Sequence, residues 1–420
     1  MDKKFSFLKE VKDRLRPDDN VINISNSFCQ KINKNLKKLK IKAICAPGGS
    51  VAKSTFIKDD YDIDIFAKFD YSYKDKEISS LLKKALSGMK GLEMLHGSRN
   101  YFQVITDSFT FEIVPVLDIS DPKKAMNVTD MSPLHVEWAK KRLKKETADE
   151  IRLTKAFFKS IGVYGAESYI NGFSGHVTDI LIIYYGSFIE FLKKAKLWKP
   201  KVIIDISGYY KKKDVFFELN KSKTLGPLIV IDPILPNRNA AAALSLEKLL
   251  LFQEKAELFL QKPSPDFFIK KKITLGLLKK EAGINTLIIF NATTNIGKTD
   301  VQGCNALKSY EHILLSFKRY GFSVINSGWE WDKTKEAIIW LIIKNEKLSN
   351  TIVIDGPPIE LKEHCLSFKK KYKNAFLKKG KLYAKVKREY AKSLLLARAL
   401  VKDNYLKTKL LSIRLIETFK

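Results

Sequence analysis

The spacing of apolar residues changes several times along the chain, and each change predicts a different kind of structure. Over residues 1–40, apolar positions such as Leu8 and Val11 recur every three or four residues, which predicts helices. From residue 41 short apolar runs take over and read as strands, with one amphipathic helix over 78–89. The first stretch of about 120 residues is therefore predicted to be a mixed α/β unit.

The remainder of the chain is predicted to alternate between helical stretches and a second mixed region. Residues 133–195 and 244–260 have mainly helical spacing, and the Pro-Ser-Pro segment at 263–265 is the strongest linker signal. Strands and a helix are expected over 286–327, and a basic helical segment from residue 363 to the end. A chain of 420 residues holds two to four domains at roughly 100–200 residues each. The pattern thus predicts a multidomain α+β protein.

The net charge of the chain indicates what kind of molecule it binds. The chain carries 76 Lys and Arg against 46 Asp and Glu, a net charge of +30, and its last 60 residues alone carry +14. Such an excess indicates an anionic partner, with nucleic acid ahead of a membrane surface. A lysine-rich solvated surface without a partner is the alternative. The 45% hydrophobic content excludes a disordered chain.

The cysteines and the lengths of the apolar runs indicate the cellular compartment of the protein. The four cysteines are scattered without a C-x-x-C pair, which argues against a zinc ribbon and a disulfide framework. No apolar run approaches the roughly 18 residues of a transmembrane helix, and the first residues lack a signal-peptide core. We therefore expect a cytoplasmic protein with reduced thiols and no membrane partner.

A glycine-rich turn followed by paired aspartates is the strongest chemical signal. Gly49 and Ser50 lie between a predicted strand and a helical turn, where backbone N–H groups can hold a phosphate. Asp62 and Asp64 follow on the next strand and share one face, about 6–7 Å apart. Carboxylates at that spacing can converge on two divalent cations. A metal pair beside a phosphate cradle is what nucleotidyl transfer requires, whereas an isolated D-x-D is more often a surface pair.

A third carboxylate completes the predicted set. Glu112 is the lone acid of the apolar run 110–116, the second strand of a predicted hairpin that begins at residue 101. A buried carboxylate without a partner is costly, so Glu112 needs either a metal or a salt bridge to a lysine.

The glycine turn and the paired aspartates resemble the motifs of a known protein family. Residues 49–55 (GSVAKST) followed by 62–66 (DIDIF) are similar to the signature of the nucleotidyltransferase superfamily that includes polymerase β. Residues 130–138 (DMSPLHVEW) resemble the D-R-S/T-P-F/L-H segment of the archaeal-type, class I CCA-adding enzymes. The likeness is strong over about residues 40–265 and thins beyond. Further matching segments follow in the family's order at 163–167, 172–175, 185–188, 232–233 and 238–239.

The resemblance implies a role for each matched residue. The metal-binding carboxylates would be Asp62, Asp64 and Glu112, with Mg²⁺ as the cofactor. The nucleotide-binding residues would be Gly49, Ser50 and Lys53 at the triphosphate, His135, Lys155 and Tyr164 around the incoming nucleotide, and Arg238 at its base. From chemistry alone other roles stay open: a helix cap for His135, a core position for Tyr164, a solvated ammonium for Lys155 and a carboxylate partner for Arg238.

Four positions depart from the family's pattern. The family often has glutamate where Asp62 stands and aspartate where Glu112 stands, which moves the oxygens by about one methylene. Lys53 replaces a frequent arginine and loses its bidentate fork. Met131 also stands in place of an arginine, so one cationic group near His135 is missing.

The resemblance also implies an architecture and an activity. We expect a nucleotidyltransferase head over 1–130 (a mixed sheet with helices), a helical neck that selects the base over 131–262, and an α/β body with a basic helical tail over 263–420. The activity would be template-independent addition of CCA to the 3′ end of tRNA from CTP and ATP, by two-metal nucleotidyl transfer. A poly(A)-type or other terminal transferase, or a catalytically decayed RNA-binding protein, is the alternative. The sequence leaves a homodimer open.

Overall fold

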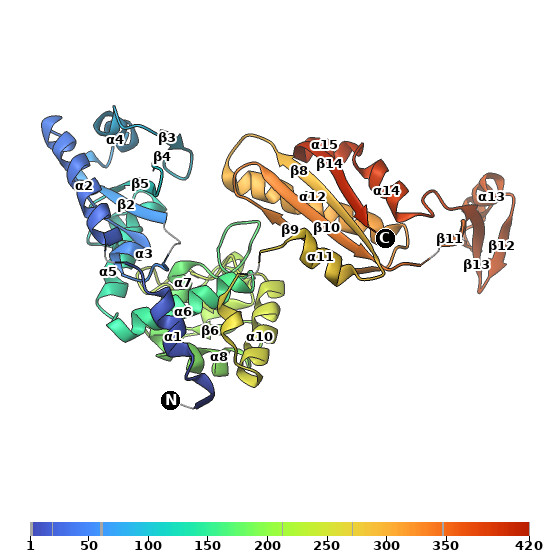
Figure 1. The fold of residues 1–420 in the computed structure, drawn as a ribbon, viewed down its shortest axis with the longest axis horizontal. Helices are drawn as coiled ribbons and strands as arrows, with labels where there is room; N and C mark the ends of the chain where they lie inside the picture. Colours follow the sequence, from blue (N-terminus) through green and yellow to red (C-terminus); the bar gives the residue numbers. More distant parts are fainter. Residues whose placement is uncertain are drawn as a thin grey trace. The chain divides into compact units, whose positions relative to one another are not determined.

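The computed structural model of the protein describes residues 3–18, 20–58, 62–211, 213–270, 272–346 and 348–419. The chain divides into two compact units, residues 1–271 and 272–420, which are described in turn (Figure 1). Tyr61, directly before the predicted aspartate pair, lies outside the described residues.

A five-stranded mixed sheet forms the first part of the first unit, in the order β1-β2-β5-β4-β3. Its central strands β2 (Asp62–Phe69) and β5 (Thr110–Leu117) run parallel, and the other pairs are antiparallel. The flanking strands are β1 (Ala43–Pro47), β4 (Tyr101–Ile105) and β3 (Leu92–Leu95). The predicted mixed α/β unit and the predicted hairpin, which is formed by β4 and β5, are both confirmed.

Two helices cover one face of this sheet. Ile63 and Ile65 of β2 are fully buried and share a core with α2 (Asn20–Lys38) and α4 (Ile78–Leu86). Because successive side chains of a strand point to opposite faces, Asp62 and Asp64, which alternate with these isoleucines, lie on the other face. The hydrophobic core therefore decides which side of the sheet carries the acids.

Helices packed around an aromatic core form the rest of the first unit. The segment predicted to be helical from residue 133 is confirmed by α5 (Ser132–Lys140), α6 (Lys145–Ser160), α7 (Gly175–Tyr185) and α8 (Phe188–Ala195). The helix predicted over 244–260 appears as α10 (Leu246–Gln261), and α1 (Leu8–Leu15) packs against α6. The shared core is rich in phenylalanine, including Phe157, Phe158, Phe173, Phe188, Phe191, Phe252 and Phe259.

A connector between α8 and α10 holds short elements. The strands β6 (Val202–Ile204) and β7 (Leu228–Val230) pair in parallel, and α9 (Val215–Glu218) lies between them in sequence. The Pro-Ser-Pro segment leads into a short 3₁₀ helix, η6 (Pro265–Phe268), whose Phe268 is buried in the core of the first unit.

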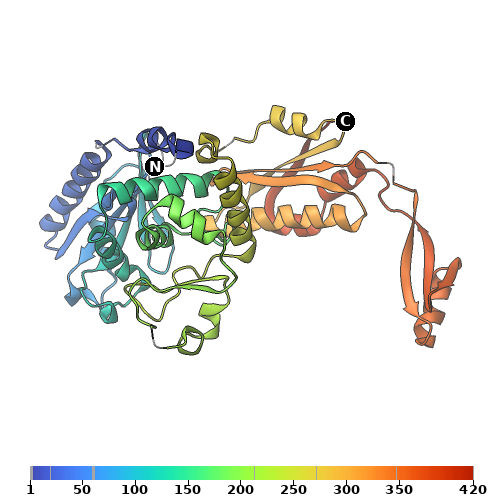
Figure 2. The ribbon, with the colours of Figure 1, turned by 90° about the horizontal axis from the view of Figure 1, so that it is seen from below.

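The second unit is built on a four-stranded antiparallel sheet in the order β14-β8-β10-β9. Its strands are β8 (Thr286–Thr294), β9 (Val324–Trp331), β10 (Glu336–Ile343) and β14 (Leu410–Phe419). The long helix α12 (Thr299–Arg319) runs along one face (Figure 2), and α14 (Ser393–Leu400) and α15 (Asn404–Lys409) contribute to the same core. The helix α11 (Leu275–Ala282) packs with the opposite side chains of β8 and β10.

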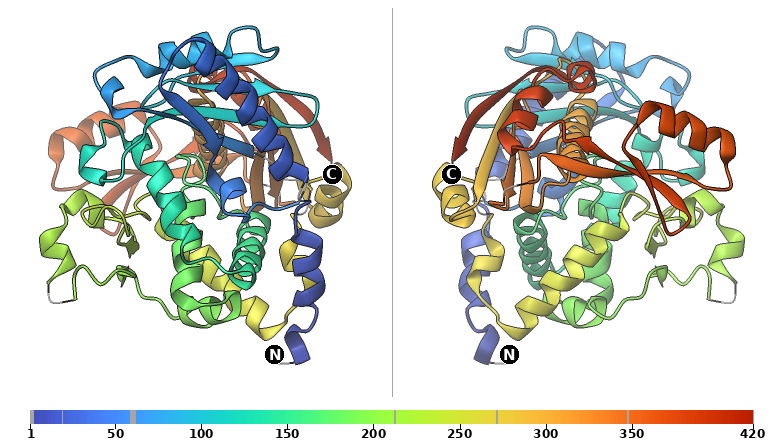
Figure 3. Two further views of the ribbon diagram at one scale, coloured as in Figure 1. Left: turned by 90° about the vertical axis from the view of Figure 1, so that its left-hand side faces the viewer. Right: turned by 90° about the vertical axis from the view of Figure 1, so that its right-hand side faces the viewer.

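A smaller three-stranded sheet in the order β11-β13-β12 carries much of the basic end (Figure 3). It is formed by β11 (Thr351–Pro358), β12 (Ala375–Lys378) and β13 (Lys381–Lys387), with α13 (Lys362–Lys371) beside β11. The prediction of a helical end is therefore wrong in part. In β13, lysines alternate with inward-facing apolar residues, and Gly380, at φ +72°, allows the turn from β12.

Candidate active site

Strand register brings the predicted carboxylates together. Asp64 of β2 lies directly beside Glu112 of the parallel strand β5, and Asp62 lies two residues earlier on the same face of β2. Glu112 accepts a hydrogen bond from the amide of Gln103 on β4 at 3.4 Å. The lysine salt bridge considered for Glu112 is not found among the described residues.

The three carboxylates repel one another in a partly buried place. Burial, with the charge of Asp62, raises the pKa of Asp64 to about 6, against a smaller lowering by Lys53 and Lys155. Burial, with the charges of Asp64 and Asp62, raises the pKa of Glu112 to about 7. Oxygen ligands under mutual repulsion are the donor set that hard divalent cations take, so these residues fit a metal centre.

Glycine at position 49 is required by the approach of Asp64. Gly49 opens the short helix α3 (Gly49–Ala52) at φ +48°, and a Cβ there would lie only 1.7 Å from Oδ2 of Asp64. The N–H of Gly48 donates to the carbonyl of Asp64 at 2.8 Å. The predicted phosphate-binding turn, including the half-buried Ser50, is thus held against a metal-binding candidate.

Charged residues of α6 and α7 hold the loop after α3. Lys53 forms an ion pair with Asp179 of α7, and both side chains are buried. Lys155 of α6 donates to the Thr55 carbonyl at 2.9 Å and to its hydroxyl at 3.2 Å. Arg152 donates to the Ser54 carbonyl. Lys155 is 3% exposed and burial lowers its pKa to about 8, so it is not a solvated lysine.

His135 and Arg238 meet at one buried carboxylate, that of Asp232. Nε2 of His135 lies 3.0 Å from each oxygen of Asp232, and a guanidinium nitrogen of Arg238 lies 2.6 Å from Oδ2. His176 joins them, with its ring 4.2 Å from that of His135. Burial raises the pKa of Asp232, but the hydrogen bond from His135 and the charge of both histidines outweigh it and hold that pKa far below its usual range.

Tyr164 lies in the segment between α6 and α7 and also packs on the helical core. It forms a β-bridge with Phe173, and the ammonium of Lys159 lies 5.0 Å from the centre of its ring. Its hydroxyl approaches Gly175, one residue before His176, so closely that a Cβ there would lie 3.0 Å from the oxygen. The side chain is half-buried, so a core role and a contact at the site are both compatible with its position.

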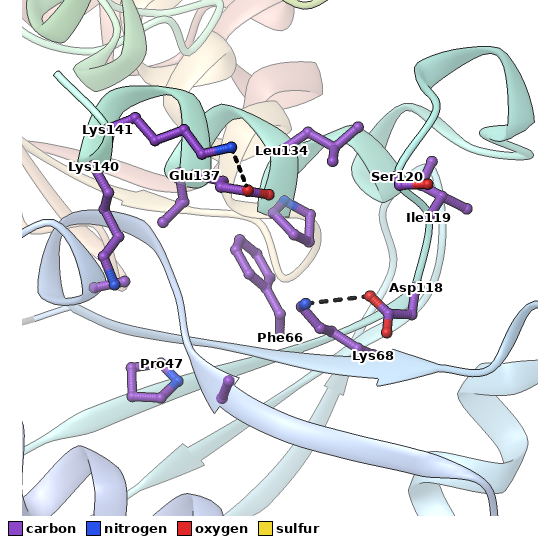
Figure 4. Close-up of a pocket in the computed structure, with 14 residues that line it drawn as sticks. Pro47, Phe66, Lys68, Asp118, Ile119, Ser120, Leu134, Glu137, Lys140 and Lys141 are labelled. Atoms are coloured by element: carbon purple, nitrogen blue, oxygen red, sulfur yellow. Dashed lines mark hydrogen bonds and ion pairs between the residues drawn. The ribbon is translucent and has the colours of Figure 1, made fainter.

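A cavity of about 810 Å³ opens between the sheet and α5 (Figure 4). Phe66 and Lys68, which share a face of β2 with the aspartates, line it together with Leu134 of α5. Two ion pairs border it: Lys68 with Asp118 at 3.2 Å, and Lys141 with Glu137 at 2.7 Å.

Two residues of the site, Asp179 and His176, are not predicted from the sequence. Asp179 is a lone acid in the apolar run of α7, which is the signal that singles out Glu112, and it could have been found in the same way. His176 has no metal-ligand spacing in the sequence, yet one nitrogen each from His135 and His176 and an oxygen of Asp232 lie within 4.8 Å of one another. The remaining histidines show no such grouping among the described residues.

The chain has a nucleotidyltransferase-like fold. It is similar to a cytoplasmic RNA terminal U-transferase with a TM-score of 0.51 and 15% identity, covering 65% of this chain and 100% of that one. The Cid1 poly(U) polymerase gives a TM-score of 0.53 with 14% identity, over 64% of this chain and 100% of that one. At this identity the likeness concerns the fold alone.

Sequence comparisons identify the family within that class. Residues 149–269 match the family model described as tRNA nucleotidyltransferase, second domain, and residues 305–410 match the one described as CCA-adding enzyme, C-terminal domain. The CCA-adding enzyme of Methanocaldococcus jannaschii is 35% identical over 85% of this chain and 80% of its own length. That of Nanoarchaeum equitans is 33% identical over 82% and 84%, and that of Methanosarcina mazei 30% identical over 94% and 88%. The chain belongs to the family of archaeal CCA-adding enzymes.

The structure contains no helix, among the residues it describes, that is long and apolar enough to cross a membrane.

Proposed function

We propose that this chain adds C, C and A to the 3′ end of tRNA from CTP and ATP without a nucleic-acid template. One observation carries the proposal: three carboxylates lie on one face of neighbouring parallel strands beside a glycine turn, in a chain of the CCA-adding family. We divide the work among a catalytic head (1–130), a base-selecting neck (131–262) and a body with a tail that hold the tRNA (263–420). We place the enzyme in the cytoplasm with its tRNA substrate, and a homodimer stays an alternative that sedimentation tests.

Asp62, Asp64 and Glu112 would hold the divalent ions, which we propose to be Mg²⁺. When bound, such a pair activates the attacking 3′-hydroxyl and neutralises the leaving pyrophosphate. The protein contributes a rigid frame, because two paired strands fix the carboxylates and the core behind Ile63 and Ile65 fixes the strands.

The triphosphate would lie along Gly49 and Ser50, next to Asp64. The ammonium of Lys53 contacts Asp179 in this structure. To bind the triphosphate, Lys53 would leave Asp179 and contact a phosphate oxygen instead. Lys155 belongs to the same site and braces the loop through Thr55. His135 and Tyr164 complete the nucleotide site. Arg238 would meet the base, because one guanidinium nitrogen is held by Asp232 while 38% of its side chain remains exposed.

The test is incubation with tRNA that ends before CCA, with each nucleotide alone and with both. We expect addition of two C residues from CTP and a complete CCA from CTP with ATP. Long homopolymer tails would instead indicate a poly(A)-type or other terminal transferase. No addition under any condition would indicate a catalytically decayed RNA-binding protein.

A further inference from the structure

One fully buried carboxylate joins three separate segments of the first unit. Asp232 lies just after β7 and accepts from the N–H groups of Ile234 and Leu235 at 2.9 and 3.2 Å. His135 comes to it from α5, His176 from α7 at 3.7 Å, and Arg238 from the connector at 2.6 Å.

These contacts use the whole hydrogen-bonding capacity of the carboxylate. An ionised aspartate offers about four acceptor positions, and the neighbours of Asp232 supply at least that many donors. Leaving a buried charge unpaired is expensive, so the partners of Asp232 are held in place by the cost of releasing them. Among them is a planar guanidinium, and fixing one nitrogen orients the exposed remainder of Arg238.

We propose that Asp232 and His176 are positioning residues, which hold Arg238 and His135 in one fixed arrangement for nucleotide selection. Base selection at Arg238 is thereby tied to the placement of α5 and α7. This inference rests on the proposed function, in which Arg238 meets the base and His135 the incoming nucleotide.

A metal ion bound by the same residues is the competing explanation, because their ligand atoms lie within 4.8 Å of one another. The contacts of Asp232 argue against it. The guanidinium of Arg238 lies 2.6 Å from Oδ2, so a metal there would face a fixed positive charge. The other oxygen already accepts two backbone N–H groups. The observed geometry satisfies the carboxylate without a cation.

The experiment is a double-mutant cycle on nucleotide preference. The kcat/KM values for CTP and UTP are measured on tRNA ending before CCA, for Asp232→Asn, Arg238→Ala and the double variant. Hydrogen bonds to charged groups are worth enough that Arg238→Ala should reduce the CTP preference by roughly tenfold or more. Asp232→Asn should reduce it by about tenfold, and the double variant should be no worse than Arg238→Ala alone.

The outcomes distinguish failure of the proposed function from failure of the positioning role. If Arg238→Ala leaves the preference unchanged, the proposed role of Arg238 fails. If Arg238→Ala acts but Asp232→Asn does not, or if the two losses multiply, the positioning role fails while the function stands.

A milder variant covers the case in which Asp232→Asn does not fold. The His176 side chain is 19% exposed, and His176→Asn should lower the CTP preference at an unchanged melting temperature. His96→Asn, an exposed histidine of the head, is the matched control and should change nothing. Metal content is measured on the same samples after addition of Zn²⁺. One equivalent bound by the parent and lost in His176→Asn would overturn the proposal in favour of a metal site.

Discussion

At the scale of single residues, the candidate site is organised around Asp64. Its carboxylate lies beside Glu112, its backbone carbonyl accepts from Gly48, and the space next to Oδ2 admits only a glycine at position 49. Asp62 on the same strand face completes the acidic surface. Because these acids repel one another, their arrangement costs stability unless a cation balances their charge.

Asp64→Asn and Asp62→Asn should each abolish incorporation of both CMP and AMP, because one set of carboxylates serves both nucleotides. We expect a loss on the order of 10³-fold or more, since metal ions supply several kcal/mol to such reactions. Binding of tRNA should survive, because it depends on phosphate contacts elsewhere. The exposed Asp107→Asn is the matched control. A variant that loses only one nucleotide would contradict a single shared site.

Glu112→Gln should stabilise the protein in the absence of divalent metal, and only at higher pH. Burial and the neighbouring acids raise the pKa of Glu112 from 4.5 to about 7, so the folded state of the parent loses stability as the pH rises through that window. The melting temperature of Glu112→Gln should match the parent below that window and exceed it by roughly a few degrees above. Scanning fluorimetry in chelator measures this, and added Mg²⁺ should abolish the advantage. If the melting temperatures of Glu112→Gln and the parent differ equally below and above this pH window, the charge of Glu112 is not the cause of the difference.

At the scale of elements, the loop after α3 is held by charges from α6 and α7. Arg152 and Lys155 donate hydrogen bonds to backbone carbonyls of the loop, and Asp179 forms an ion pair with Lys53. The helices therefore fix the segment proposed to hold the triphosphate, which links the sheet to the helical part of the same unit.

Asp179→Ala should be strongly destabilising because it leaves Lys53 without its buried partner. The expected loss in the free energy of unfolding is about 3–5 kcal/mol, as for other broken buried pairs. The matched control is Glu137→Ala, which removes the exposed pair with Lys141 and should cost no more than about 1 kcal/mol. Urea denaturation measures both. Equal losses would show that Lys53 finds solvent or another acceptor when Asp179 is absent.

At the scale of the whole molecule, positive charge is concentrated toward the C-terminal end. The last 60 residues carry a net charge of +14, distributed over helices and strands of the second unit. Four lysines at the end of α13 and just beyond it, at positions 369, 370, 371 and 373, are all exposed. Such a surface suits duplex RNA, which proteins read by shape and backbone.

Removing the charge of Lys369, Lys370, Lys371 and Lys373 together should weaken tRNA binding and make it less sensitive to salt. If each lysine releases about one counterion, the slope of log affinity against log salt should shrink by roughly 3–4 units. The matched control neutralises the exposed lysines of α2 and its end, Lys34, Lys37, Lys38 and Lys40, and should leave the slope unchanged. Equal slopes for the α13 variant and the parent would show that these lysines are solvated and do not contact tRNA phosphates.

Much of the local structure and chemistry follows from the sequence. Alternation along β2 places Asp62 and Asp64 on one face, and helical spacing predicts the helices between residues 133 and 195, because both depend on the geometry of consecutive residues. The basic end was predicted less well. Its lysines mask the alternation in β13, and β14 is a strand because it pairs with the distant β8.

Tertiary structure alone decided which distant side chains meet. The parallel pairing of β2 with β5 sets Glu112 beside Asp64, and no local pattern specifies that register. Lys53 finds Asp179 across 126 positions, and His135 finds Asp232 across 97. The three acids, the glycine turn and the family of the chain can be recognised from the sequence, since they depend on the identity and spacing of residues close together along the chain. The partners were decided by packing, because burial forces each charge to take whichever opposite group the fold brings within reach.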